Sequence, residues 1–177
     1  PGAVLRIGYA PSLTAGILPR TLERFQEEHP AVRIELVDVA PTEMIRMAQQ
    51  GRLDVLIALE PAVTTTPGFH WSVLRRIKLV LVLCADDPLA KLKRVPPKRL
   101  RDVSLVGLAR ENFPSYVPHL RSILKPHGIV PRFVKLENDG VSTLFETVEA
   151  HRAAAILADS VVGILPRTLV CRPFSPE

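Results

Sequence analysis

Two hydroxyl residues stand where the sequence passes from a strand-like segment into a helical one. Ser12 and Thr14 lie in a polar turn between the alternating apolar residues of 5–9 and the amphipathic pattern of 17–28. A helix N-terminus carries backbone N–H groups without intrahelical partners and a partial positive charge, so hydroxyls placed there favour an anion. Capping of the helix by one hydroxyl is the alternative interpretation. An anion site becomes the better interpretation if several such turns converge on one place.

The chain lacks the residue patterns of the common catalytic and metal sites. Neither Ser12 nor Ser115 has a histidine or lysine base next to it in the sequence, so a serine nucleophile is not expected. His119 and His127 are too far apart for two metal ligands on one helical turn, and no cysteine or carboxylate cluster accompanies them. No GxGxxG or GxxxxGKS/T phosphate-binding motif occurs. We therefore expect no enzyme activity, no metal and no cofactor.

Length and composition limit the class of protein. A chain of 177 residues that is 47% hydrophobic can form one medium domain or two small ones. No apolar run reaches the roughly 18 residues that a membrane span needs, and the amino end has neither an initiator methionine nor a signal peptide. We expect a fragment of a longer protein. Cys84 and Cys171 lie in apolar, strand-like surroundings typical of reduced, packed thiols, which favours the cytoplasm.

The net charge of +5 raises the question of nucleic-acid binding. The densest basic run, KLKRVPPKRLR at 91–101, contains no aromatic residue for base stacking, and its Pro-Pro pair would break a recognition helix. A solvated loop is the preferred interpretation of this run. Any contact with DNA is expected through a segment outside this sequence.

Strand and helix patterns alternate along the first part of the chain. We expect Thr42 to cap the second helix and Gly51 to end it in a left-handed conformation. The nearly continuous apolar run at 53–59 is typical of a parallel strand that is covered on both faces. A doubly wound α/β layer is predicted from the order of these elements, with strands at 5–9, 32–39 and 53–59 and helices at 17–28 and 43–50.

The second part of the chain repeats this alternation. Ser142 or Asp139 is expected to cap the helix at 144–150. We predict a first lobe at 1–77, a second lobe at 78–171, and a return toward the first lobe that starts at 172–177. The second lobe is expected to contain strands at 79–84, 102–108, 132–136, 153–157 and 169–172 and helices at 119–125, 144–150 and 160–165.

Three segments in order resemble a known family. They are LRIGYAPSLTAGILPRTLERFQEEHPAVRIELVDVAPTEMIRMAQQGRLDVLIALEP, LVLVLCADDPLA and NDGVSTLFETVEA. Together they resemble the effector-binding domain of LysR-type transcriptional regulators over nearly the whole chain. The resemblance implies an α/β clamshell of the periplasmic-binding-protein-like type II: two Rossmann-like lobes joined by crossover strands, with a small effector in the cleft between them. It also implies DNA binding only through an amino-terminal winged helix-turn-helix, which this sequence does not contain.

Carried over by position, the resemblance implies effector contacts from both lobes. Both would present hydroxyls and helix N-termini to one cleft, which favours an organic anion, commonly a carboxylate in this family. It further implies a homodimer or homotetramer without membrane contact, in which helix 17–28 of one subunit lies along helix 119–125 of another. The implied effector contacts are Ser12, Leu13, Thr14, Pro41, Thr42, Pro114, Ser115, Tyr116, Val141 and Ser142.

The chain departs from the family pattern in three places. His151 and Arg152 replace a glycine-rich turn, so a left-handed residue here would cost about 1 kcal/mol, and a basic pair near the cleft could attract an anion. Ala158 replaces the usual proline. The sequence stops at Glu177, about where a further strand and helix of the first lobe are expected. The alternative function is a solute-binding protein of a transport system, which shares the clamshell.

Overall fold

Two β-sheets make up the framework of the computed structural model, which describes residues 2–14, 16–59 and 67–174. The first sheet is parallel, with the order β2-β1-β3, and consists of β1 (Val4–Tyr9), β2 (Arg33–Asp38) and β3 (Val55–Leu56). In the second sheet, of order β6-β5-β7-β4-β8, β4 runs antiparallel to both of its neighbours. Its strands are β4 (Leu79–Cys84), β5 (Ser104–Leu108), β6 (Arg132–Glu137), β7 (Ala154–Ala158) and β8 (Leu169–Pro173).

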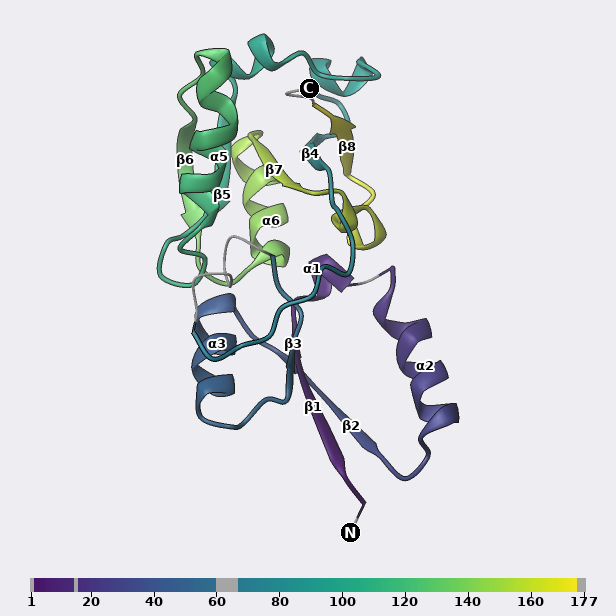
Figure 1. The fold of residues 1–177 in the computed structure, drawn as a ribbon. Helices are drawn as coiled ribbons and strands as arrows, with labels where there is room; N and C mark the ends of the chain where they lie inside the picture. Colours follow the sequence, from purple (N-terminus) through teal and green to yellow (C-terminus); the bar gives the residue numbers. More distant parts are fainter. Residues whose placement is uncertain (1, 15, 60–66, 175–177) are drawn as a thin grey trace.

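Helices follow the parallel strands as the sequence predicts (Figure 1). The short helix α1 was not predicted: it occupies the turn after β1, where a turn without a helix was expected. The α-helices within the described residues are α1 (Pro11–Thr14), α2 (Leu18–Glu28), α3 (Pro41–Gln49), α5 (Tyr116–Leu124) and α6 (Val141–His151). The same residues also form the 3-10 helices η1 (Pro88–Lys91), η2 (Pro97–Asp102), η3 (Lys125–His127) and η4 (Asp159–Ile164).

The second sheet is covered on both faces and forms the main core. On one face, α6 packs Leu144 and Val148 against alternate residues of β4, β5 and β7. On the other face, Leu120 and Leu124 of α5 pack together with the apolar residues of η1 and η2. Strand β4 lies between β7 and the edge strand β8 and is buried along nearly all its length, and its bounds match the strand predicted at 79–84.

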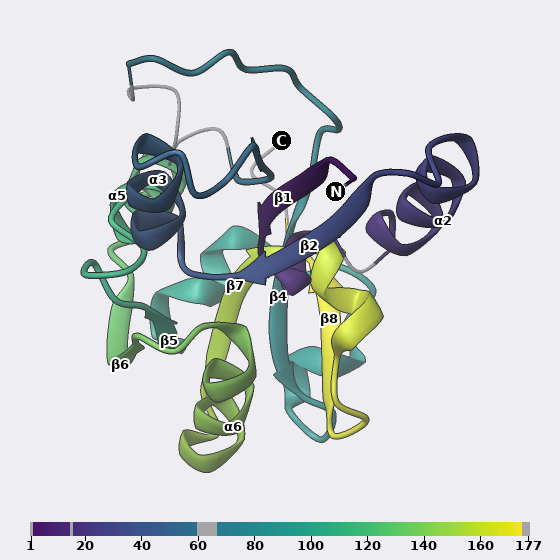
Figure 2. The same cartoon turned by 90° about the horizontal axis from the view of Figure 1, so that it is seen from below.

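The first sheet has a much smaller core. Its buried cluster consists of Met44, Met47 and Leu53 on the face toward α3, while Figure 2 shows α2 on the opposite side of β1 and β2. The strand predicted at 53–59 is present but much shorter, and the expectation that it is covered on both faces was wrong. Strand β3 has two residues, and Val55 is 40% exposed, because β3 lies at the sheet edge with β1 as its neighbour among the described residues.

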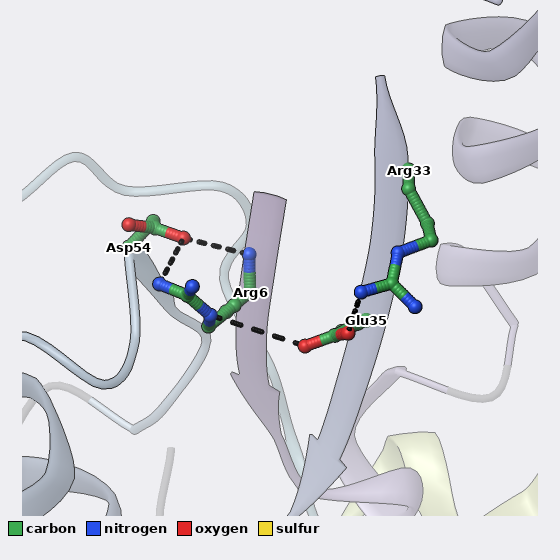
Figure 3. Close-up of polar contacts among 4 residues, drawn as sticks. All are labelled: Arg6, Arg33, Glu35 and Asp54. Atoms are coloured by element: carbon green, nitrogen blue, oxygen red, sulfur yellow. Dashed lines mark hydrogen bonds and ion pairs between the residues drawn. The ribbon is translucent and has the colours of Figure 1, made fainter. Parts of the chain in front are cut away.

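A row of charged side chains crosses the first sheet (Figure 3). Arg6 of β1 lies opposite Glu35 of β2 in the strand register, and its backbone N–H donates to the Asp54 carboxylate at 2.8 Å. Arg33 approaches the same Glu35 with an N–O distance of 2.6 Å. Such exposed ion pairs contribute at most about 1 kcal/mol each. The ion pair between Arg6 and Glu35 joins residues that are opposite each other in the parallel register of β1 and β2. In the same register the two strands end side by side.

The helix starts differ from the predicted caps. Thr42, Ser142 and Asp139 do not cap helices: the N-cap residues are Ala40 and Gly140, and neither helix has a side-chain cap. Helix α3 instead starts with Pro41, whose missing N–H would have no intrahelical partner at this position. At the carboxyl end of α3, Gly51 is left-handed as predicted.

The chain end remains part of the second sheet as far as it is described. Arg172 pairs with Leu81 in the ladder between β4 and β8, and the buried Phe174 forms a bridge with Val95. Residues 172–174, expected to begin a return to the first lobe, therefore still belong to the second sheet. Residues 175–177 lie outside the described residues.

Arg152 adopts the left-handed conformation that the sequence departure suggested, with φ at 46°. Its guanidinium lies 2.8 Å from the carboxylate of Asp86. Arg152 follows the last residue of α6, about 15 Å from the helix start at 1.5 Å per residue. Arg152 thus lies at the opposite end of α6 from the helix start and pairs with Asp86, and the hypothesis that this basic pair near the cleft attracts an anion stays a prediction.

Replacing Arg152 should separate backbone strain from ion pairing. Both Arg152→Gly and Arg152→Ala lose the contact with Asp86, but only glycine relieves the left-handed strain. We expect the glycine variant to be about 1 kcal/mol more stable than the alanine variant in urea unfolding. Equal stability of the two variants would show that the conformation carries no strain.

Candidate functional site

The carboxyl ends of the parallel strands in the two sheets face each other (Figure 1). β1 and β2 end at the paired residues Tyr9 and Asp38, and β5 and β6 end at the paired residues Leu108 and Glu137. Ligands of open α/β sheets bind outside the carboxyl ends of the strands. All predicted site residues follow these four strand ends, in α1, at the start of α3, before and at the start of α5, and at the start of α6.

Thr42 connects the two sheets. Its Oγ1 lies 3.2 Å from the carbonyl oxygens of both Glu111 and Asn112, in the segment between β5 and α5. The side chain of Asn112 in turn donates to the carbonyl of Asn138, before α6, at 3.0 Å. The hydroxyl that was expected to cap α3 therefore donates across the junction and holds the start of α3 against the second sheet.

Helix α1 brings the first predicted turn to the junction. It packs against η4, which follows β7 of the second sheet. Thr14 is 5% exposed, and its hydroxyl donates to the carbonyl of Ala10 at 3.1 Å. Ser12 is half-buried, and its hydroxyl has no hydrogen-bond partner among the described residues. Of the two hydroxyls in this turn, Ser12 is thus available to a ligand and Thr14 is occupied within the turn.

Ser115 and Ser142 supply similar available groups from the second sheet. Ser115 is half-buried just before α5, and Ser142 is exposed in the first turn of α6. Neither hydroxyl bonds to another described residue. The first N–H groups of each helix also lack intrahelical acceptors. Both helix starts can therefore offer donors to an anion.

Tyr116 has a different role from its neighbour Ser115. Its hydroxyl donates to the carbonyl of Ile156 in β7 at 2.9 Å. Burial raises the pKa of Tyr116, so the phenol stays protonated. This bond ties the start of α5 to the sheet. The remaining predicted residues, Leu13, Pro41, Pro114 and Val141, contribute apolar surface at the same four strand ends.

A buried carboxylate, which the sequence analysis missed, supports the edge of this site. Glu137 ends β6, is 6% exposed, and accepts a hydrogen bond from Thr147 of α6. Lys135 lies 3.1 Å from the same carboxylate oxygen. The Thr147 hydrogen bond, followed by Lys135, lowers the pKa of Glu137. No local motif marks this contact, because Glu137 and Thr147 meet only when α6 packs on the sheet.

Two open surface grooves of the described residues lie elsewhere. They run between α2 and β2, and Leu22, Ile34 and Leu36 line one of them. This surface is on the outer side of the first sheet and lacks the converging serine hydroxyls of the junction. We therefore take the junction, rather than these grooves, as the candidate site.

Other classes of site receive no support from the described residues. No three histidine, cysteine or carboxylate side chains in the described ranges come together as a metal site. No helix in the described part of the chain is both long and apolar enough to cross a bilayer. Cys84 and Cys171 are free thiols, and burial raises the pKa of both, that of Cys171 to about 11. Neither thiol is therefore an activated nucleophile.

Comparison with known proteins identifies the family. Residues 1–177 match the family model described as the LysR substrate binding domain, and the chain belongs to this family. The transcriptional regulator BenM of Acinetobacter baylyi is 29% identical over 129 residues, which cover 72% of this chain and 42% of BenM. HcaR, the hca operon transcriptional activator of Escherichia coli, is 28% identical over 140 residues, or 79% of this chain and 47% of HcaR. The chain spans about half the length of these curated relatives.

Solved structures share the fold. The BenM effector-binding domain with its effector benzoate has a TM-score of 0.78 at 24% identity, covering 99% of this chain and 79% of that one. The effector-binding domain of QuiR in complex with shikimate has a TM-score of 0.79 at 16% identity, covering 100% and 83%. The chain therefore has the α/β, periplasmic-binding-protein-like type II fold, and the resemblance found in the sequence is confirmed.

Replacing Thr147 should expose the contribution of the buried carboxylate. A depressed pKa means that ionised Glu137 contributes stability above its unfolded-state pKa of about 4.3, and this is lost as pH falls through the folded-state pKa. We expect Thr147→Val to lower the free energy of unfolding by about 2 kcal/mol at neutral pH. The difference from wild type should shrink as the pH falls through the lowered folded-state pKa of Glu137, because the carboxylate is then protonated in both proteins.

The matched control for this measurement is Thr143→Val on the same helix. Thr143 is half-buried, and its hydroxyl bonds to no other described residue, so a small loss of stability without pH dependence is expected. A Thr147→Val loss that stays constant from pH 7 to pH 3 would contradict the assigned role of Glu137.

Proposed function

We propose that this chain is the effector-sensing regulatory domain of a LysR-type DNA-binding transcriptional regulator. Residues 1–77 and 78–171 act as two lobes, and a small organic anion, most simply a carboxylate, binds between them. The observation that carries the proposal is the set of available serine hydroxyls, Ser12, Ser115 and Ser142, at facing strand ends. The ligands benzoate and shikimate in two solved neighbours support a carboxylate.

The proposed signal is a change in the angle between the lobes. Thr42 bonds across the junction, and Arg75, in the segment that leads into β4, pairs with Asp159 of η4 at 3.0 Å. These contacts favour one arrangement of the two sheets. An effector shifts the population only if it binds one lobe angle more tightly, by a few kcal/mol for a nearly complete shift.

The whole regulator is proposed to act in the cytoplasm as a homodimer or homotetramer without enzymatic activity. DNA recognition belongs to an amino-terminal winged helix-turn-helix. In the pairing that the family implies, α2 of one subunit lies along α5 of another. Leu22, Ile34 and Leu36 in the groove beside α2 offer apolar surface for such a two-fold contact. The regulator is preferred over a transport protein because the curated relatives reported above are transcriptional regulators.

Ligand binding can be tested with a thermal-shift screen of small carboxylates. A ligand at a hundredfold its dissociation constant should add about 2.7 kcal/mol of stability. Ser12→Ala and Ser115→Ala should each weaken the binding of a carboxylate hit about tenfold, the loss of roughly 1.4 kcal/mol from one charge-assisted hydrogen bond. The control is Ser122→Ala on the outer side of α5, whose hydroxyl bonds to the carbonyl of His119. Unchanged affinity in both site variants would reject the proposed site.

Thr42 can be tested by small-angle scattering without ligand. Thr42→Val removes the bond across the junction, whereas Thr42→Ser retains the hydroxyl. We expect a larger radius of gyration for the valine variant and wild-type scattering for the serine variant. Identical scattering of all three proteins would show that Thr42 does not restrain the lobe angle.

A further inference from the structure

The positive charge of this protein is concentrated in one segment. Pro88–Asp102 contains six basic residues and one acidic residue, whereas the rest of the chain has 17 of each. This segment alone therefore accounts for the formal net charge of +5. Figure 1 shows the segment after β4 at the end of the second sheet that is farthest from the first sheet.

The basic segment is fixed to the protein core. Leu89, Val95 and Leu100 are buried among the apolar residues that cover the second sheet. The Val95 backbone N–H donates to the carbonyl of Pro173 at 2.9 Å, and the Asp87 carboxylate caps η1 through the N–H of Leu89 at 2.7 Å. The chain therefore holds these charges on two short helices and the segment between them, with buried anchors, unlike the solvated loop expected from the sequence.

Four of the six cations of this segment are exposed and form no ion pair with a described residue. These four are Lys91, Lys93, Lys98 and Arg99. Elsewhere in the described ranges some basic residues pair with carboxylates and others do not, so the feature that distinguishes this segment is its six basic residues against one acidic residue. Unneutralised cations held close together repel one another, and a polyanion relieves that repulsion while releasing its own counterions.

The surface continues beyond η2. The guanidinium of Arg101 donates to the carbonyl of His127 at 3.4 Å, which places η2 next to η3. The exposed Lys125 belongs to this neighbouring helix. The cationic surface therefore spans two adjacent elements at one end of the second sheet.

We propose that Pro88–Asp102 is a binding surface for the phosphate backbone of duplex DNA. Phosphate contacts need fixed cations and carry no sequence information, so the missing aromatic residues and the Pro-Pro pair do not oppose them. This contact is additional to the helix-turn-helix contact expected from the sequence. This proposal rests on the proposed function. When a DNA-binding regulator is held on its operator, the DNA stays within reach of Pro88–Asp102 at a high effective concentration.

The test is the salt dependence of binding to a 30-base-pair duplex of arbitrary sequence, followed by fluorescence anisotropy with the 177-residue chain. If each of the four unpaired cations neutralises one phosphate, log Kobs should fall with log salt at a slope of about −3.6. Lys98→Glu combined with Arg99→Glu should reduce the magnitude of the slope by about 1.8. The control is Arg20→Glu combined with Arg52→Glu. It makes the same change in net charge at exposed positions in the first lobe, and it should leave the slope unchanged.

Three results would overturn the proposal. The first is that the chain does not bind the duplex at 25 mM salt. The second is that both double variants weaken duplex binding equally, and the third is that polyglutamate displaces the labelled duplex as effectively per charge as unlabelled DNA does. The second result would indicate a net-charge effect, and the third an acidic protein partner. Thermal shifts with small carboxylates on the same variants separate this proposal from the sensor function, because Lys98 and Arg99 lie outside the junction.

Discussion

The parallel register of two strand pairs determines where this protein can bind a ligand. Tyr9 lies opposite Asp38 in the first sheet, and Leu108 lies opposite Glu137 in the second. The two strands of each pair therefore end side by side. The strand ends of the first sheet face the strand ends of the second sheet. Four helix starts meet at the junction as a result, although they are far apart in the sequence. A slip of either register would separate these turns and turn their side chains to the wrong faces.

The hydroxyl groups at the junction divide into two sets. Thr14, Thr42 and Tyr116 donate to backbone carbonyls and hold the turns, the two sheets and α5 in place. Ser12 and Ser115 have no protein partner among the described residues and can satisfy an incoming anion. A binding site needs both kinds of group, because available donors discriminate between ligands only when their positions are fixed.

Sequence patterns predicted most strands and helices but not the contacts between them. The strand at 79–84 and the left-handed Gly51 were confirmed, since local composition determines both. The strand predicted at 53–59 is only two residues long, and its expected coverage on both faces was wrong, because an apolar run does not show which of its faces is covered. The bond of Thr42 to the second sheet and the pairing of Glu137 with Thr147 join distant segments, so no local motif could reveal them.

The most direct test of the account is a crystal structure of the chain with the small carboxylate that stabilises it most. We expect the carboxylate within hydrogen-bonding distance of Ser12 from the first sheet and of Ser115 or Ser142 from the second. A ligand in the groove between α2 and β2, or one that contacts a single sheet, would contradict binding between the two lobes.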